Sequence, residues 1–166
     1  MLPEDFSLSF LARTVRPNGW VLELVQAAQA AGWEVGVVVT PQATKFVDLP
    51  VLEHLTGYPV RSEYKHLKEP AALPRADAIV VFPATFNPLN KWALDVSDTL
   101  AVGLLYEYTG LKRPIVAVPC MLTASGLDTY PAFSRSIEQL REYGVPVLAR
   151  RRSLPEKNGL RSYERT

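Results

Sequence analysis

The sequence is poor in the residues on which several protein classes depend. Its 166 residues include one cysteine, Cys120, and two histidines. One cysteine cannot form an internal disulfide and suits a reducing cytoplasm. So few cysteines and histidines also argue against a structural zinc site, and we expect no metal. Eighteen basic and seventeen acidic residues leave a formal charge of +1, and the sequence has no basic stripe that would predict nucleic-acid binding.

Long apolar runs are also missing. No run approaches the roughly 20 residues that a membrane-spanning helix needs. Near the start stand Glu4 and Asp5, whereas a secretory signal peptide begins with positive charge. We therefore expect a cytoplasmic protein without a membrane partner.

What is present is an ordinary globular composition, with 48% hydrophobic and 21% charged residues. Strand-like apolar segments alternate with helix-like segments, which predicts right-handed βαβ crossovers. The expected fold is a three-layer α/β domain, Rossmann-like or flavodoxin-like, with a mainly parallel sheet. We assign residues 1–152 to this domain and the polar residues 153–166 to a mobile tail. The predicted strands cover residues 6–12, 33–39, 76–82, 114–118 and 145–149, and the predicted helices cover 20–31, 89–108 and 131–143, with a further one opening at Thr40 and Pro41.

One strand ends in an unusual way. Residues 82–101 read FPATFNPLNKWALDVSDTLA, so Thr85 and Asn87 place two hydrogen-bonding side chains at a strand's carboxyl end, with Phe86 between them. In parallel α/β sheets ligands bind beyond these ends. The pattern leaves two interpretations open: a proline-rich turn that caps the next helix, or a ligand-binding loop. Thr40, after the preceding strand, offers donors at a helix N-terminus, where anions bind well.

Three motifs resemble those of the homo-oligomeric flavin-containing cysteine decarboxylases, a flavoprotein family. ADAIVVFPATFNPLNKWALDVSDTLA is similar to the family's A-D-x-x-x-x-x-P-A-[ST]-x-N-x-x-x-K-x-A-x-G-x-x-D-x-L, and VVVTPQATKFV to its V-x-x-T-x-x-A-x-x-F. VPCM, followed by PAFSRSIEQLREYGV, is similar to the family's P-x-M-N-x-x-M-W and the helix after it. The resemblance covers roughly residues 7–149 and implies FMN as the cofactor, with Asp98 facing the site from the following helix. The FMN-binding residues that it implies are Thr14, Arg16, Thr40, Phe46, Pro83, Ala84, Thr85, Phe86, Asn87, Asp98 and Met121.

The chain also departs from the family pattern. The first loop, Thr14-Val15-Arg16-Pro17-Asn18, lacks the family's glycine. The position of the family's active-site histidine is Glu69, with His66 three residues away, and Leu122 stands where the family has asparagine.

The resemblance implies oxidative decarboxylation of a cysteine-containing substrate. A base takes the thiol proton, the flavin accepts a hydride from Cβ, and CO2 leaves the resulting thioaldehyde. We favour His66 over Glu69 as this base, because an ordinary imidazole pKa of about 6.5 lies nearer the working pH than a carboxylate pKa of about 4.3. Glu63 and Asp128 remain alternatives. The altered third motif favours a specialised substrate, the C-terminal cysteine of a peptide in natural-product biosynthesis.

Two other functions remain open at this point. The missing histidine and asparagine would suit a non-catalytic or regulatory FMN-binding protein, and the fold would also suit an enzyme similar to the flavin prenyltransferases. In each case the family resemblance implies a homotrimer or a dodecamer of trimers.

Overall fold

A computed structural model describes residues 7–12, 19–64, 73–120, 126–150 and 163–164. The strands are β1 (Ser7–Ala12), β2 (Glu34–Val39), β3 (Ala78–Ala84), β4 (Ile115–Pro119), β5 (Ala149–Arg150) and β6 (Tyr163–Glu164). The helices are α1 (Gly19–Ala30), α2 (Leu49–Thr56), α3 (Phe86–Ala93), α4 (Leu100–Gly110) and α5 (Pro131–Glu142), with a short 3-10 turn, η1 (Ala43–Lys45).

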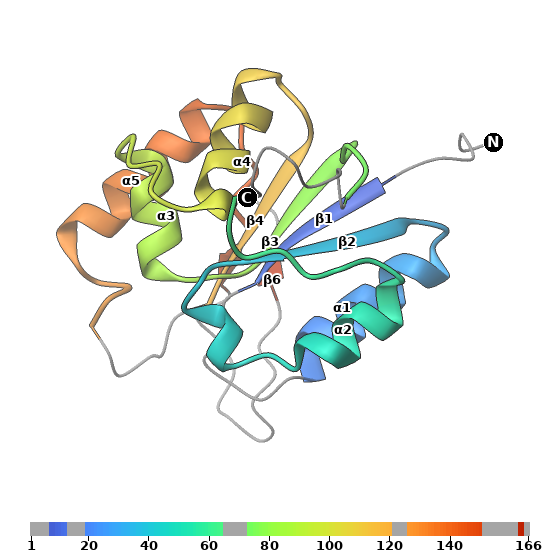
Figure 1. Cartoon of the computed structure of the whole chain (residues 1–166). Coiled ribbons are helices and arrows are strands. Elements are labelled where there is room, and N and C mark those ends of the chain that lie inside the picture. Colours follow the sequence, from blue (N-terminus) through green and yellow to red (C-terminus); the bar gives the residue numbers. More distant parts are fainter. Residues whose placement is uncertain (1–6, 13–18, 65–72, 121–125, 151–162, 165–166) are drawn as a thin grey trace.

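The predicted fold class is confirmed. A parallel sheet lies between α1 and α2 on one face and α3, α4 and α5 on the other (Figure 1). None of the helices in these described ranges is long and apolar enough to cross a bilayer.

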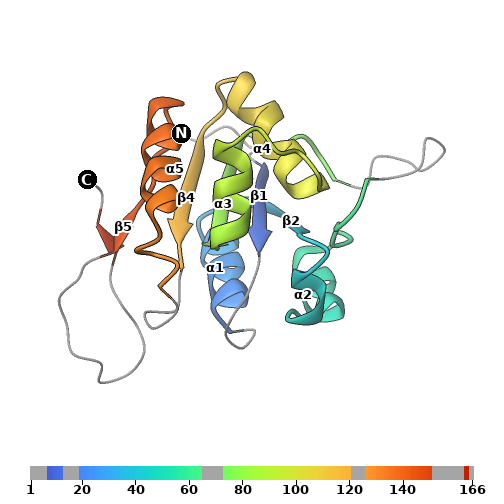
Figure 2. The same ribbon diagram turned by 90° about the vertical axis from the view of Figure 1, so that its left-hand side faces the viewer.

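The sheet has the strand order β2-β1-β3-β4, and every neighbouring pair is parallel. Val147 extends it beyond β4 through one parallel bridge to Ala117. The predicted strand over 145–149 is therefore reduced to this bridge, and β5 pairs antiparallel with β6 instead. From β1 the chain adds β2 on one side and then β3 on the other, so the direction of winding reverses between β1 and β3. Figure 2 shows the arrowheads of β1 and β4 pointing to the same edge of the sheet.

The sheet buries a core on each face. The core under α1 and α2 includes Val25, Val35 and Leu52, and the larger core under α3, α4 and α5 is built around Trp92 and Leu105. Both cores draw on alternate residues of the strands, because successive side chains of a strand point to opposite faces. This two-sided burial explains why EVGVVV of β2 is nearly all apolar.

The prediction of one helix over 89–108 was wrong. The structure has two helices, α3 and α4, joined by residues 94–99. Asp95 adopts a positive φ of 59°, which a continuing helix cannot accommodate, and Thr99 caps α4 by accepting a hydrogen bond from the Val102 N–H at 3.3 Å. Tyr106 of α4 then donates to the Lys91 and Trp92 carbonyls at the end of α3, at 2.7 and 3.0 Å. Burial, followed by the nearby Asp95 and Tyr143, raises the pKa of Tyr106 above its ordinary value of 10.0, so this donor stays protonated.

The helix expected to open at Thr40 and Pro41 begins later. A turn and η1 follow β2, and α2 starts only at Leu49. Asp48 accepts a hydrogen bond from the Val51 N–H at 3.2 Å and so caps α2. Thr40 accepts a hydrogen bond from the Ala43 N–H, at 3.3 Å, in the turn that leads into η1.

Candidate functional site

The candidate site lies at the carboxyl edge of the sheet, where the winding reverses between β1 and β3. Leu11 of β1 pairs with Val38 of β2 and with Val81 of β3. Two residues further along, Thr40 and Pro83 therefore reach the same level on either side of β1. With strands about 4.8 Å apart, the two residues stand roughly 10 Å from each other. The topology thus brings together the two motifs that the sequence analysis had singled out on neighbouring loops.

Thr85 is the most informative residue at this edge. It is 6% exposed, and its Oγ1 is the one buried side-chain oxygen or nitrogen in the described ranges that has no hydrogen-bond partner. Thr85 occupies the N-cap position of α3, yet its hydroxyl makes no capping bond. The interpretation that this threonine simply caps the helix is therefore wrong. A buried hydroxyl without a partner costs free energy, so the site fits a ligand with a polar group at this point.

The rest of the loop is held firmly around Thr85. Pro83 follows a cis peptide bond, and both Pro83 and Ala84 are buried. The Ala84 carbonyl accepts a hydrogen bond from the Cys120 N–H at 2.9 Å, which ties the loop to the end of β4. Asn87 is exposed in the first turn of α3, where backbone N–H groups have no partner within the helix. The loop therefore offers donors as well as the Thr85 hydroxyl.

Phe86 is among the FMN-binding residues that the resemblance implies, and in the structure its ring packs against Phe133 and Tyr130. It stacks on Phe133, with centroids 5.8 Å apart and planes at 24°, and meets Tyr130 edge-on at 5.8 Å and 74°. These contacts make Phe86 part of the support of the loop.

On the neighbouring loop, Thr40 is half-buried at the end of β2, whereas Phe46 is 53% exposed after η1. Asp98 had been expected on a helix facing the site. The structure places it in the link between α3 and α4, where it is exposed and forms an ion pair with Lys91. Asp98 therefore fastens the link to the end of α3.

Five predicted residues lie outside the described residues: Thr14, Arg16, His66, Glu69 and Met121. Their assignment stays a prediction from the sequence.

An aromatic pair at the same edge was not assigned to the site from the sequence. Trp20 of α1 stacks on Phe82 of β3, with centroids 6.5 Å apart and planes at 29°. Both rings are partly buried, and Phe82 directly precedes Pro83. The signal available in the sequence was position alone, since Trp20 opens the helix after β1 and Phe82 ends an apolar run.

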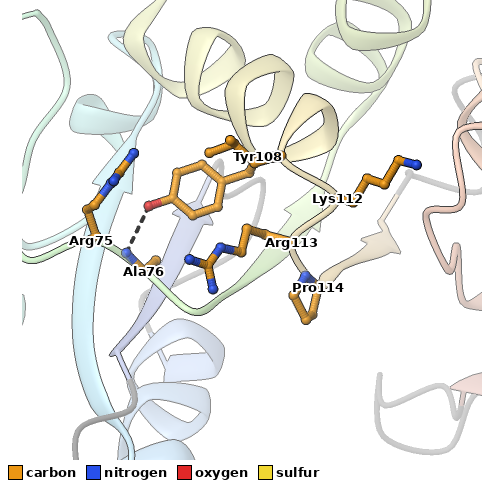
Figure 3. Close-up of a pocket in the computed structure, with 7 residues that line it drawn as sticks. Arg75, Ala76, Tyr108, Lys112, Arg113 and Pro114 are labelled. Carbon is orange, nitrogen blue, oxygen red and sulfur yellow. Dashed lines mark hydrogen bonds between the residues drawn. The ribbon is translucent and has the colours of Figure 1, made fainter.

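A pocket lies at the opposite edge of the sheet, before β3 and β4. This pocket of about 450 Å³ is lined by Arg75, Tyr108 and Arg113 among others, and Figure 3 shows the Tyr108 ring between the two arginines. Arg75 faces Glu107 at 3.8 Å, and Arg113 faces Asp77 at 3.7 Å. Because these basic groups already have carboxylate partners and lie far from the carboxyl edge, we do not include the pocket in the candidate site.

Comparisons with known proteins show the family to which the chain belongs. The family model described as Flavoprotein matches residues 20–161. The chain is 31% identical over 122 residues to the coenzyme A biosynthesis bifunctional protein CoaBC of Thermococcus kodakarensis; the match covers 70% of this chain and 30% of that relative. The chain thus spans about a third of the relative's length.

Solved structures share the fold. The FMN-dependent cysteine decarboxylase SpaF superposes with a TM-score of 0.75 at 24% identity, covering 96% of this chain and 89% of SpaF. The peptidyl-cysteine decarboxylase EpiD superposes with a TM-score of 0.66 at 20% identity, covering 95% and 92%. At these sequence identities the structural likeness shows a common fold only. The family is shown by the family model, which matches most of the chain. The chain belongs to the flavoprotein family.

Proposed function

We propose that this protein is an FMN-dependent decarboxylase of a cysteine-containing substrate, and that the substrate is the C-terminal cysteine of a peptide. One observation carries the proposal: a flavoprotein-family chain holds a buried Thr85 hydroxyl without a partner, at the point where its sheet reverses direction. Open α/β sheets bind their ligands at such points, and flavodoxin-like folds bind FMN there.

The described residues fit a flavin at this edge of the sheet. The Thr85 hydroxyl would donate a hydrogen bond to the cofactor. The N–H groups of the first turn of α3 would face negative or carbonyl groups of the cofactor. Asn87 stands exposed in that turn and adds an amide side chain. Thr40, at the same level across β1, would contribute a hydroxyl from the other side.

The cofactor and the chain would divide the chemistry between them. Bound FMN would supply the two-electron oxidant, taking a hydride from the substrate Cβ, so that the substrate becomes a thioaldehyde able to lose CO2. The chain's part is to orient the substrate and to take the thiol proton, since a thiol with an ordinary pKa of about 8.5 is mostly protonated at neutral pH. His66 is the proposed base, with Glu69 as the alternative.

A second substrate has its own support. The relative that is 31% identical is named for coenzyme A biosynthesis, and that name favours a small cysteine conjugate such as phosphopantothenoylcysteine. The altered substrate motif, with Leu122 at the family's asparagine position, favours the peptide. Both substrates carry a free carboxylate on the cysteine and place the same demands on the base.

Mass spectrometry distinguishes these possibilities. FMN-loaded protein would be incubated with a peptide ending in cysteine, with the same peptide ending in serine, and with phosphopantothenoylcysteine. The proposal predicts a loss of about 46 Da, CO2 plus two hydrogens, from the cysteine peptide alone. Turnover of phosphopantothenoylcysteine alone would select the second substrate, and no mass change in any sample would favour a non-catalytic flavin-binding protein.

We also propose that the active form is a homotrimer, alone or within a dodecamer. Apolar side chains are exposed on the link between α3 and α4 and next to it: Leu94 is 63% exposed, Val96 44% and Tyr143 41%. Val96 and Tyr143 both lie beside Tyr106. A patch of this kind is typical of a subunit contact.

A further inference from the structure

Two side chains of α3 and two of α5 form a contact that the sequence motifs do not include. Phe86 and Asn90 stand four residues apart and therefore lie on one face of α3, and Phe133 and Ser136 share a face of α5. The rings of Phe86 and Phe133 stack at 5.8 Å, and the Ser136 hydroxyl donates to Asn90 Oδ1 at 2.6 Å. One apolar and one polar contact thus join the two helices over a single turn.

The polar contact is built into the interior. Ser136 is 2% exposed and Phe133 8%, and both neighbouring leucines, Leu89 and Leu140, are fully buried. The Ser136 hydroxyl also lies 3.0 Å from the Ala132 carbonyl of its own helix, so it has a local acceptor as well. A bond across helices, 46 residues apart in sequence, sets the rotation and height of one helix against the other, which the local bond cannot do.

This contact acts on the first turn of α3. Phe86 is the first residue of the helix and directly follows Thr85, so whatever holds the Phe86 ring also fixes the Thr85 hydroxyl and the adjacent N–H groups. On the other side, Ala84 is tied to Cys120. The loop is therefore anchored from both ends, by β4 and by α5.

We propose that Ser136 and Phe133 are positioning residues of the flavin site, although they lie on α5 and the family resemblance assigns them no part in binding FMN. The inference rests on the proposed function of the 83–87 loop. Its physical basis is that a ligand held by several hydrogen bonds loses affinity when its donors shift by a fraction of an ångström. Ser136 holds the far end of that turn through Asn90, and Phe133 holds the near end through Phe86.

The test compares Ser136→Ala with Ser134→Ala. Ser134 lies on the same helix but is exposed, so its variant removes an identical hydroxyl without touching α3. Titration of flavin-free protein with FMN, followed by flavin fluorescence, should give a Kd raised about five- to tenfold in Ser136→Ala and unchanged in Ser134→Ala. Phe133→Leu, which removes the ring stack and keeps an apolar side chain, should also raise the Kd and serves if Ser136→Ala does not fold.

A double variant separates positioning from general stability. Ser136→Ala alone leaves Asn90 without its donor, whereas Asn90→Ala with Ser136→Ala leaves no orphaned group. Measured in the absence of FMN, the melting temperature of the double variant should therefore return toward the wild-type value. Its Kd for FMN should stay raised. If the Kd of the double variant returned to the wild-type value together with the melting temperature, the inference would be overturned. Wild-type affinity for FMN in both Ser136→Ala and Phe133→Leu would also overturn it. If the wild type itself binds no FMN, the proposed function fails and takes this inference with it.

Discussion

At the scale of single residues, a substitution of Thr85 distinguishes a ligand contact from a structural role. Its hydroxyl is buried and has no partner among the described residues, so Thr85→Val removes no hydrogen bond from the flavin-free protein. We expect the melting temperature of that form to be unchanged or higher, because an unsatisfied polar group is replaced by a methyl group. The FMN-bound form should lose a hydrogen bond of about 1–2 kcal/mol, so the Kd for FMN should rise about 5- to 30-fold in a fluorescence titration. Equal affinity in the two proteins would remove Thr85 from the site.

His66 is the residue on which the chemical prediction depends. His66→Ala should lower turnover by about 100- to 10,000-fold, the usual contribution of a general base, while the FMN content stays as in the wild type. Product formation would be followed by mass spectrometry, and flavin content by absorbance. Glu69→Gln is the companion variant. If His66→Ala keeps its turnover and Glu69→Gln loses it, the base is Glu69 and the preference for imidazole was mistaken.

At the scale of secondary-structure elements, Tyr108 connects α4 to the entry of β3. Its ring is 7% exposed, and its hydroxyl oxygen accepts a hydrogen bond from the Ala76 N–H at 2.8 Å (Figure 3). Tyr108→Phe leaves this buried N–H without a partner and should lower the free energy of unfolding by about 1–3 kcal/mol. Tyr64→Phe is the matched control, since Tyr64 is 62% exposed and its bond to the Thr99 carbonyl is long, at 3.5 Å. Denaturant unfolding should show a change within about 0.5 kcal/mol for the control. Equal losses in both variants would contradict the assignment.

Some of the secondary-structure elements could be predicted from the sequence and others could not. Alternating apolar runs predicted the parallel sheet and its helical layers, because burial on both faces leaves a strong pattern in a strand such as β2. The break between α3 and α4 was missed because residues 89–99 contain no glycine or proline; it depends on the positive φ of Asp95 and the cap by Thr99, for which Ser97-Asp98-Thr99 was the available signal.

The same limits apply to the site. The motif around Thr85 could be found from its position at a strand end and from its resemblance to the family. These signals identified the loop but not the partners of each side chain. That Phe86 packs on α5, and that Ser136 supports α3, depends on contacts between residues about 46 positions apart. A serine inside a helix carries no local signal for such a bond.

At the scale of the whole molecule, the proposed trimer depends on the exposed apolar patch at Leu94, Val96 and Tyr143. Light scattering on the purified protein should give three chain masses or a multiple of three. Leu94→Asp should dissociate the assembly, because a charge would be buried in the contact. Leu111→Asp, at the other end of α4 and 51% exposed, should leave it intact. A monomeric wild type at micromolar concentration would contradict the proposal.

The most direct test of the proposed chemistry is an anaerobic spectrum. Without oxygen to reoxidise the cofactor, each cysteine-ended peptide that is oxidised and decarboxylated should reduce one flavin, and absorbance at about 450 nm should fall in proportion to peptide consumed. The serine-ended peptide should leave the spectrum unchanged. We predict bleaching by one equivalent of cysteine peptide, together with one equivalent of CO2. A flavin-loaded protein that keeps its full absorbance and leaves the cysteine peptide intact would contradict the account.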